Sequence, residues 1–142
     1  MLDDYSNGGA RRAQQMMEPK QLIEAAKAAM EFAYAPYSGF RVGAAICTEN
    51  GKVYTGCNVE NESYGATICA ERTAAVKAVS EGECRFVQLA VVSSADRITP
   101  PCGICRQFLA EFAADMTVYL AEGDSILTVP FADLFPQAKL PL

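Results

Sequence analysis

Two short cysteine-bearing stretches constrain this 142-residue chain more than any other feature. Residues 69–72 read Cys-Ala-Glu-Arg, and residues 101–106 read Pro-Cys-Gly-Ile-Cys-Arg. Each has the pattern of the first turn of a helix, and in the second the two cysteines stand at i and i+3, on one helical face. Helical Cβ atoms tilt toward the N-terminus, so first-turn side chains reach into the space ahead of the helix. A fold that uses these cysteines together must bring two helix starts side by side.

The three cysteines form a candidate metal site. The positive end of a helix dipole favours thiolate over thiol. Cys69 would add a third thiolate to Cys102 and Cys105, and three protein ligands with one open position are typical of a catalytic zinc site. Glu71 is not on the helical face of Cys69, but its longer side chain can curl around the helix end toward that open position. The pattern predicts one zinc ion per chain, because thiolates outcompete oxygen ligands for this ion.

Two other kinds of site remain open for the same residues. The Cys-x-x-Cys at 102–105 could be a redox dithiol, although the third cysteine and the glutamate have no role in one. A closed structural zinc site is the second alternative, with Cys47, Cys57 or Cys84 as its fourth ligand. In isolation, each of these three cysteines is interpreted as a small buried hydrophobic residue.

The chain contains no histidine. This excludes Ser-His-Asp and Cys-His catalysis and every metal site that uses histidine. Proton transfer must then fall to a carboxylate, lysine, tyrosine or cysteine. The net charge of −5 also lacks the basic surface that polynucleotide binding needs, which favours a small neutral substrate.

Cysteine usage and hydropathy suggest a location. Six cysteines without a signal peptide predict a reducing compartment. No apolar run approaches the ~18 residues of a membrane span. We therefore expect a cytoplasmic protein with no membrane contact.

The order of predicted elements indicates an α/β fold. A flexible N-terminal tail is expected over 1–17, followed by a single domain over 18–142. Strand-helix-strand-helix-strand order after a first helix predicts a three-layer α/β/α sandwich. Four helices are predicted. The first begins at Pro19 and ends before Pro36, the second runs from an N-cap at Thr67 to Ser80 with Gly82 as the stop, the third extends from Cys102 to about Ala114, and the fourth covers 131–135. The predicted strands cover 40–47, 52–57, 86–92, 116–121 and 126–129, with a hairpin turn at Asn50-Gly51.

Four motifs together resemble the zinc-dependent cytidine deaminases, specifically the small homotetrameric kind with three cysteine ligands. They are Pro-Tyr-Ser-x-Phe-x-Val-Gly-Ala-Ala at 36–45, Gly-Cys-Asn-Val-Glu-Asn at 56–61, Cys-Ala-Glu-Arg-Thr-Ala at 69–74 and Pro-Cys-x-x-Cys-Arg-Gln at 101–107. The resemblance runs from roughly Glu18 to Pro136. It implies the fold of that family, with a central mixed sheet.

The resemblance also implies roles for individual residues. Glu71 would be the catalytic proton carrier in an attack of zinc-activated water on C4 of the base, a mechanism general to zinc deaminases. Arg72 would soften the negative charge of a zinc ion with three thiolates.

Four further residues are expected to bind substrate. Asn58 and Glu60 match the positions that hold the 3′-hydroxyl of the sugar. Phe40 would stack on the base, with filling of the core as the alternative for this residue, and Ala70 is expected to contact the substrate as well.

The implied function is hydrolytic deamination of cytidine and 2′-deoxycytidine to uridine and 2′-deoxyuridine in pyrimidine salvage, by a homotetramer. A deaminase of a different amino-heterocycle is the closest alternative. In one place the chain departs from the family. Lys139 stands where the family has a phenylalanine that enters a neighbouring subunit's site, which leads us to expect that Phe131 or Phe135 supplies the apolar contact.

Overall fold

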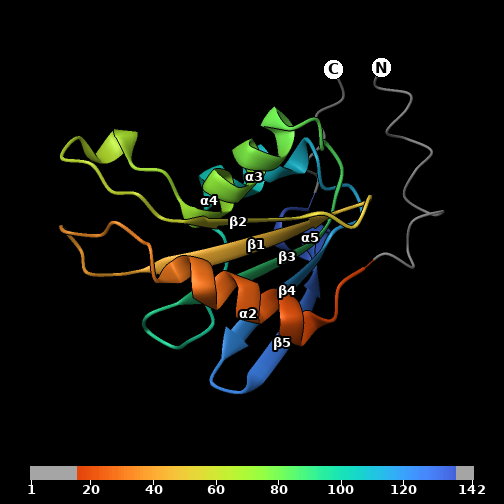
Figure 1. Cartoon of the computed structure of the whole chain (residues 1–142), viewed down its shortest axis with the longest axis horizontal. Coiled ribbons are helices and arrows are strands. Elements are labelled where there is room, and N and C mark those ends of the chain that lie inside the picture. The colour runs from red at the N-terminus through yellow and green to blue at the C-terminus, as the bar shows by residue number, and fades with distance from the viewer. Residues whose placement is uncertain (1–15, 137–142) are drawn as a thin grey trace.

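A five-stranded sheet with helices on both of its faces organises the computed structural model of the chain (Figure 1). The structure describes residues 16–136. Most of the predicted tail and Lys139 therefore lie outside the described residues. The strands are β1 (Val42–Thr48), β2 (Val53–Cys57), β3 (Phe86–Ser93), β4 (Thr117–Glu122) and β5 (Ser125–Pro130); the helices are α2 (Pro19–Met30), the 3₁₀ turn η2 (Tyr64–Ala66), α3 (Ala70–Ser80), α4 (Gly103–Ala110) and α5 (Phe131–Leu134).

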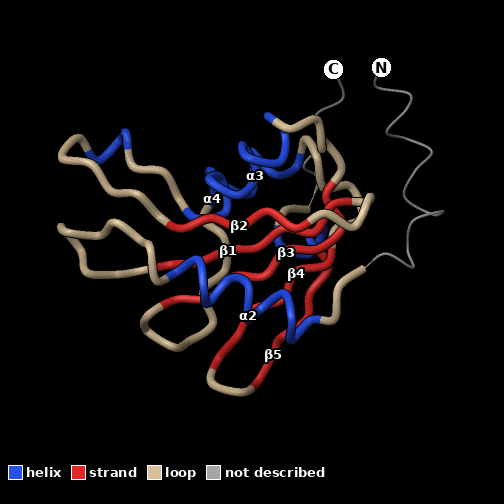
Figure 2. The backbone as a smooth tube through the Cα atoms, in the orientation of Figure 1, coloured by secondary structure: helices blue, strands red, loops and turns tan. Residues whose placement is uncertain are grey.

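The sheet is mixed, as expected. Its strand order is β2-β1-β3-β4-β5. The pairings β1–β2, β1–β3 and β4–β5 are antiparallel, whereas β3 and β4 run parallel. A parallel pair needs a crossover connection, and α4 lies in the one that joins these two strands. The tube in Figure 2 shows the sheet with α2 on one side and α3 and α4 on the other, which confirms the three-layer α/β/α sandwich.

Alternation along the strands divides the core into two layers. Successive strand residues point to opposite faces of a sheet. In β1, Ala44 and Ile46 pack in the layer beneath α3 and α4, while Ala45 and Cys47 pack in the layer beneath α2. Residues of β3 and β4 contribute to both layers in the same way. The predicted alternative that Cys47 completes a metal site with the other cysteines is wrong, because its side chain lies on the opposite face of the sheet.

Two glycines let helices approach the sheet closely. A Cβ atom on Gly56 of β2 would lie 2.5 Å from the carbonyl oxygen of Ala70 and 2.5 Å from the main-chain nitrogen of Ala74, both in α3. A Cβ on Gly43 of β1 would collide with the Ala26 carbonyl oxygen of α2. Contacts this short exclude any side chain. Gly56 therefore fixes the first turn of α3, and with it the cysteine-bearing end, against the edge strand.

The start of α3 and the end of α4 differ from the prediction. Ile68 forms an antiparallel bridge with Val59, which keeps this segment extended, so the N-cap of α3 is Cys69 and not Thr67. Helix α4 ends at Ala110 rather than near Ala114, because the carbonyl oxygen of Phe112 accepts a hydrogen bond from the Phe86 N–H at the start of β3.

Helix α3 buries one face against the sheet, and the residues ahead of α2 are bonded to β3. Ala74, Ala75 and Ala78 of α3 are buried, but Val76 is exposed. Ahead of α2, the main-chain N–H and carbonyl of Met17 both bond the buried Gln88 side chain, at 2.7 and 2.8 Å. Among the described residues, no helix has the length and apolar character that crossing a membrane requires.

Candidate active site

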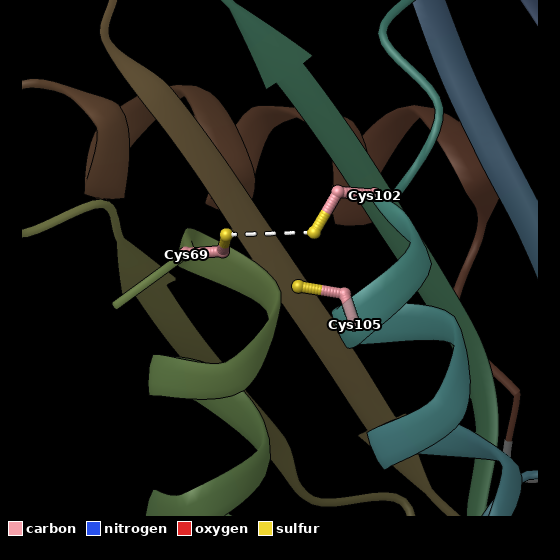
Figure 3. Close-up of side chains that lie close together, drawn as sticks. All are labelled: Cys69, Cys102 and Cys105. Atoms are coloured by element: carbon pink, nitrogen blue, oxygen red, sulfur yellow. Dashed lines mark hydrogen bonds between the residues drawn. The ribbon is translucent and has the colours of Figure 1, made fainter. Parts of the chain in front are cut away.

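The three predicted cysteine ligands converge at the starts of α3 and α4 (Figure 3). Cys69 and Cys102 are the N-cap residues of the two helices, and Cys105 lies one turn into α4. Their sulfur atoms all lie within 4.8 Å of one another. Cys105 is buried, Cys69 is half-buried and Cys102 is exposed, so the cluster opens to one side.

This arrangement fits a zinc ion. Thiolates held tetrahedrally at about 2.3 Å from zinc lie about 3.8 Å apart. The Cys69 and Cys102 sulfurs are 3.8 Å apart. All six cysteines belong to the described residues, and the cluster contains only these three. The absence of a fourth cysteine counts against a closed structural site.

Two cysteines of the cluster share a proton. The Cys105 thiol donates a hydrogen bond to Cys69, which, with help from Arg72, lowers the pKa of Cys69 to about 5 against the opposing effect of burial. The same hydrogen bond, followed by burial and the nearby Glu71 charge, raises the pKa of Cys105 above its usual range. The protein thus presents one thiolate, that of Cys69, before any metal binds, and the Cys105 thiol would lose its proton on binding a metal.

Glu71 is a buried carboxyl group in the first turn of α3. Its exposed fraction is 4%. Burial is the main cause that raises its pKa to about 7, and the charge of Cys69 acts in the same direction, while its own main-chain N–H and Arg72 oppose it. A carboxyl group whose pKa lies near the working pH can both accept and return a proton, which is what acid–base catalysis requires.

Arg72 links the cysteine cluster to the neighbouring loop. Its Nη2 lies 3.5 Å from the Cys69 sulfur and 3.4 Å from the Thr67 carbonyl oxygen, where it donates a hydrogen bond to each. The guanidinium therefore places a positive charge against the Cys69 sulfur.

A short extended segment, residues 58–60, lies beside the start of α3. The bridge between Val59 and Ile68 is antiparallel, so Asn58 lies opposite Cys69 and Glu60 lies opposite Thr67. On its other side, the segment bonds Tyr34 through two main-chain hydrogen bonds of 3.0 and 2.8 Å. This pairing brings two of the predicted substrate-binding residues next to the cysteine cluster.

Asn58 is buried, with an exposed fraction of 8%, and its amide group contacts main chain. Its Nδ2 donates to the Phe40 carbonyl oxygen at 2.8 Å, and its Oδ1 accepts from the Val42 N–H at 2.8 Å. The side chain therefore joins the start of β1 to the end of β2. One amide hydrogen is left over for a ligand, because an asparagine amide carries two.

Glu60 holds a loop and faces an open pocket. Its Oε1 accepts hydrogen bonds from the N–H groups of Tyr37 and Ser38, at 3.0 and 3.1 Å, and its Oε2 accepts one from the Ser38 hydroxyl. The Ser38 hydroxyl is the main cause that holds the pKa of Glu60 below its usual range. The pocket has a volume of about 410 Å³ and is lined by Tyr37, Ser38, Glu60, Asn61, Tyr64 and Thr67.

Phe40 and Ala70 differ in what they can offer a ligand. Phe40 is half-buried and packs against the core layer beneath α3 and α4. Ala70 is fully buried in that same layer, main chain included, so the structure leaves it no exposed surface to offer a ligand. Phe131 is also buried in this layer, at 3% exposure, and is not available to another subunit. Phe135 is half-buried beside it.

Sequence reasoning missed the bonds between Ser38 and Glu60. The two residues are 22 positions apart, and neither a helical nor a strand period relates them. A Pro-Tyr-Ser run such as 36–38 favours a turn, but a turn signal says nothing about which distant carboxylate will accept its N–H groups.

Comparison with known proteins points to one group. Residues 16–121 match the family described as "Cytidine and deoxycytidylate deaminase zinc-binding region". A cytidine deaminase of Halalkalibacterium halodurans is 50% identical over 125 residues, covering 86% of this chain and 94% of the relative. A crystal structure of cytidine deaminase from Burkholderia pseudomallei has a TM-score of 0.82 and 46% identity, covering 87% of this chain and 100% of that chain. A blasticidin-S deaminase of Bacillus cereus is 27% identical over 124 residues, covering 82% of this chain and 88% of the relative.

Proposed function

The chain belongs to the cytidine and deoxycytidylate deaminase family, and from this membership we propose that it deaminates cytidine and 2′-deoxycytidine to uridine and 2′-deoxyuridine. It is an enzyme, a hydrolase that acts on a carbon–nitrogen bond. Placement of the reaction in pyrimidine salvage follows from these substrates and is part of the proposal.

The observation that carries the proposal is the buried Glu71 carboxyl beside three convergent cysteines. The cluster formed by Cys69, Cys102 and Cys105 fits zinc in ligand type, number and sulfur spacing. We assign one zinc ion to each chain at this cluster, held by these three residues. Zinc in such a site lowers the pKa of water toward 7 and so makes a nucleophile available at neutral pH.

In the proposed mechanism Glu71 moves the protons. With a pKa of about 7, it is partly ionised at neutral pH and can accept a proton from the attacking water. It delivers that proton to the ring nitrogen next to C4. It then takes a second proton from the hydroxyl group that the attack leaves on C4 and passes it to the amine, which departs as ammonia. Burial supports this role, because a solvated carboxylate would have too low a pKa to return a proton. Arg72 offsets the charge of the thiolates throughout.

The region around residues 58–60 is proposed to bind the nucleoside. Glu60 would accept a hydrogen bond from the 3′-hydroxyl of the sugar, and Asn58 would donate its remaining amide hydrogen to it. Phe40 would stack on the base. The contacts of Glu60 support an acceptor role, since its pKa is lowered and it stays ionised.

A different amino-heterocycle is the second candidate substrate. The 27% identical relative is named a blasticidin-S deaminase, so this fold is related to such enzymes. The relative with 50% identity over most of the chain is named a cytidine deaminase, which favours the nucleoside. Direct competition between cytidine and blasticidin S would separate the two.

Assembly and location complete the proposal. Large apolar side chains are exposed on the loops around the site, which supports burial against further copies of the chain in a homotetramer. All six cysteines are free, which supports a reducing compartment such as the cytoplasm. These exposed side chains are Phe32, Tyr34, Tyr37, Val59, Tyr64 and Ile68.

One assay tests the proposed function. Purified protein is incubated with cytidine while the loss of cytidine absorbance and the release of ammonia are followed, and its zinc content is measured in parallel. We expect about one zinc per chain, activity that disappears on zinc removal and returns on adding zinc, and a sedimentation coefficient of a tetramer. A metal-free protein with full activity would overturn the zinc assignment, and a stable, fully active monomer would overturn the assembly.

A further inference from the structure

The hydroxyl group of Ser38 occupies a junction between two parts of the proposed nucleoside site. It accepts a hydrogen bond from the Phe40 N–H at 3.0 Å. It also donates its own hydrogen to Oε2 of Glu60. One hydroxyl therefore connects the main chain of the proposed base-stacking residue to the proposed sugar-binding carboxylate.

The two carboxylate oxygens of Glu60 have different donors, and the Ser38 hydroxyl bonds only one of them. Oε1 already accepts two main-chain N–H groups, from Tyr37 and Ser38. Among the described residues, Oε2 has the Ser38 hydroxyl as its hydrogen-bond donor. An ionised carboxylate has about four acceptor positions, so one position on Oε2 remains for a ligand. The Ser38 hydroxyl sets the direction in which that position points.

The main chain of Phe40 is held by hydrogen bonds at both its N–H and its carbonyl oxygen. Its N–H bonds Ser38 and its carbonyl oxygen bonds the Asn58 amide, at 3.0 and 2.8 Å. A hydroxyl that accepts one hydrogen bond becomes a better donor in the next, so the two contacts of Ser38 strengthen each other. Both Ser38 and Glu60 line the pocket of about 410 Å³, a volume suited to a small-molecule site.

We propose that Ser38 is a positioning residue that orients Glu60 relative to Phe40 and thereby determines the preference for nucleosides with a free 3′-hydroxyl. This inference rests on the proposed function and adds a specificity determinant to it. Ser38 acts through Glu60 and does not need to touch the substrate. A purely structural role, in which its hydroxyl only stabilises the turn at 38–40, would leave that preference unchanged.

Binding measurements on a catalytically silent enzyme test the proposal. In the Glu71→Gln background, calorimetry gives dissociation constants for cytidine and 3′-deoxycytidine without turnover. We expect this parent to prefer cytidine by at least ~10-fold, the effect of one hydrogen bond to a charged group. Adding Ser38→Ala should reduce that preference by about 3- to 10-fold, the effect of a neutral hydrogen bond. Ser38→Thr, which keeps a hydroxyl, should restore it.

Two matched controls separate positioning from structure. Ser94 also accepts a hydrogen bond from main chain next to Phe40, from the Arg41 N–H at 3.0 Å, but it has no bond to Glu60. Ser94→Ala should therefore leave the preference within about twofold of the parent. In a Glu60→Gln background, Ser38→Ala should change the preference by less than about twofold, since the two residues act as a unit.

The outcomes distinguish this inference from the proposed function. If the parent binds cytidine with the expected preference and Ser38→Ala keeps it, the positioning role is wrong and the proposed function stands. If Ser38→Ala lowers the preference equally with and without Glu60→Gln, the role is structural and the inference also fails. If the parent shows no preference for the 3′-hydroxyl, the proposed sugar site itself is wrong. Should Ser38→Ala fail to fold, Ser38→Cys, whose thiol is a weak donor, replaces it with the same expectation.

Discussion

The two carboxylates near the site, Glu71 and Glu60, are held in opposite ways. Glu71 is 4% exposed and its pKa is raised to about 7, because burial disfavours its charged form. Glu60 lines an open pocket and its pKa is lowered, because one hydroxyl and two N–H groups bond its charged form. The same side-chain chemistry therefore produces a group that can exchange protons near neutral pH and a group that remains a fixed acceptor.

The difference comes from the backbone that presents each group. Glu71 lies in the first turn of α3, which packs directly on β2 at Gly56, so little room remains for water. Glu60 lies in a loop whose partner segment, 37–38, turns its N–H groups toward it. At Glu71 burial outweighs the main-chain donor and raises the pKa, whereas at Glu60 the donors outweigh burial and lower the pKa. The comparison predicts that substitutions at the two positions affect different measurements.

The largest expected effect is on catalysis at Glu71. Glu71→Gln keeps the size of the side chain but cannot accept a proton, so kcat should fall by ~10²- to 10⁴-fold with zinc content unchanged. Steady-state kinetics with metal analysis measure both quantities. Glu111, which is exposed at the end of α4, provides the control, since Glu111→Gln should leave kcat within about twofold. Turnover within a few fold of the wild type would remove Glu71 from its proposed role.

The same substitution should change stability in a pH-dependent way. In the metal-free protein the pKa of Glu71 is raised from 4.5 to about 7. Its contribution to the free energy of unfolding is therefore complete below pH about 4.5 and is lost as the pH rises through about 7. Glu71→Gln has no such loss, so it should become more stable than the wild type by up to ~3 kcal/mol between those pH values.

Urea unfolding of the two metal-free proteins at pH 5 and pH 8, followed by circular dichroism, measures this difference. A stability difference that does not change with pH would show that Glu71 is not held in its neutral form by burial.

At Glu60 the expected effect is on substrate binding. Glu60→Gln keeps a carbonyl oxygen for the Tyr37 and Ser38 N–H groups but removes the charge. We expect kcat/KM for cytidine to fall by ~10- to 150-fold, the effect of a hydrogen bond to a charged group. For cytosine, which has no sugar, it should change by less than about twofold. Equal losses for both compounds would contradict sugar binding by Glu60.

The smallest effect is expected at Asn58, and it is structural as well as functional. Asn58→Ala leaves the Val42 N–H and the Phe40 carbonyl without their partner. The free energy of unfolding should fall by about 1–3 kcal/mol. Asn61, which is exposed and accepts one bond from the Ser63 N–H, serves as the control, with an expected change within about 0.5 kcal/mol for Asn61→Ala. Thermal or urea unfolding measures both, and equal stability of the two variants would show that the Asn58 contacts contribute nothing.

The cysteine cluster could be predicted because local rules describe it. The i, i+3 spacing of Cys102 and Cys105 places them on one helix face wherever the helix lies. The same holds for the order of strands and helices, which predicted the layers, and for Gly82, which ends α3 as expected with a φ of +91°. Where a distant contact decided the outcome, the predictions were wrong: the bridge between Val59 and Ile68 moved the start of α3, and the Phe112–Phe86 hydrogen bond shortened α4.

The sequence by itself determined the candidate cysteine ligands, the absence of histidine and the order of the elements, since these depend on residue type and short spacing. Only the tertiary structure decided that Cys47 faces the other layer, that Glu71 is buried enough to raise its pKa, and that Ser38 bonds Glu60. Each of these depends on which segments meet across the sheet or between loops, and short-range periodicity carries no information about such meetings. The same reason explains why the charge states of Glu71 and Glu60 could not be distinguished from sequence, although the motifs that contain both residues could be recognised there.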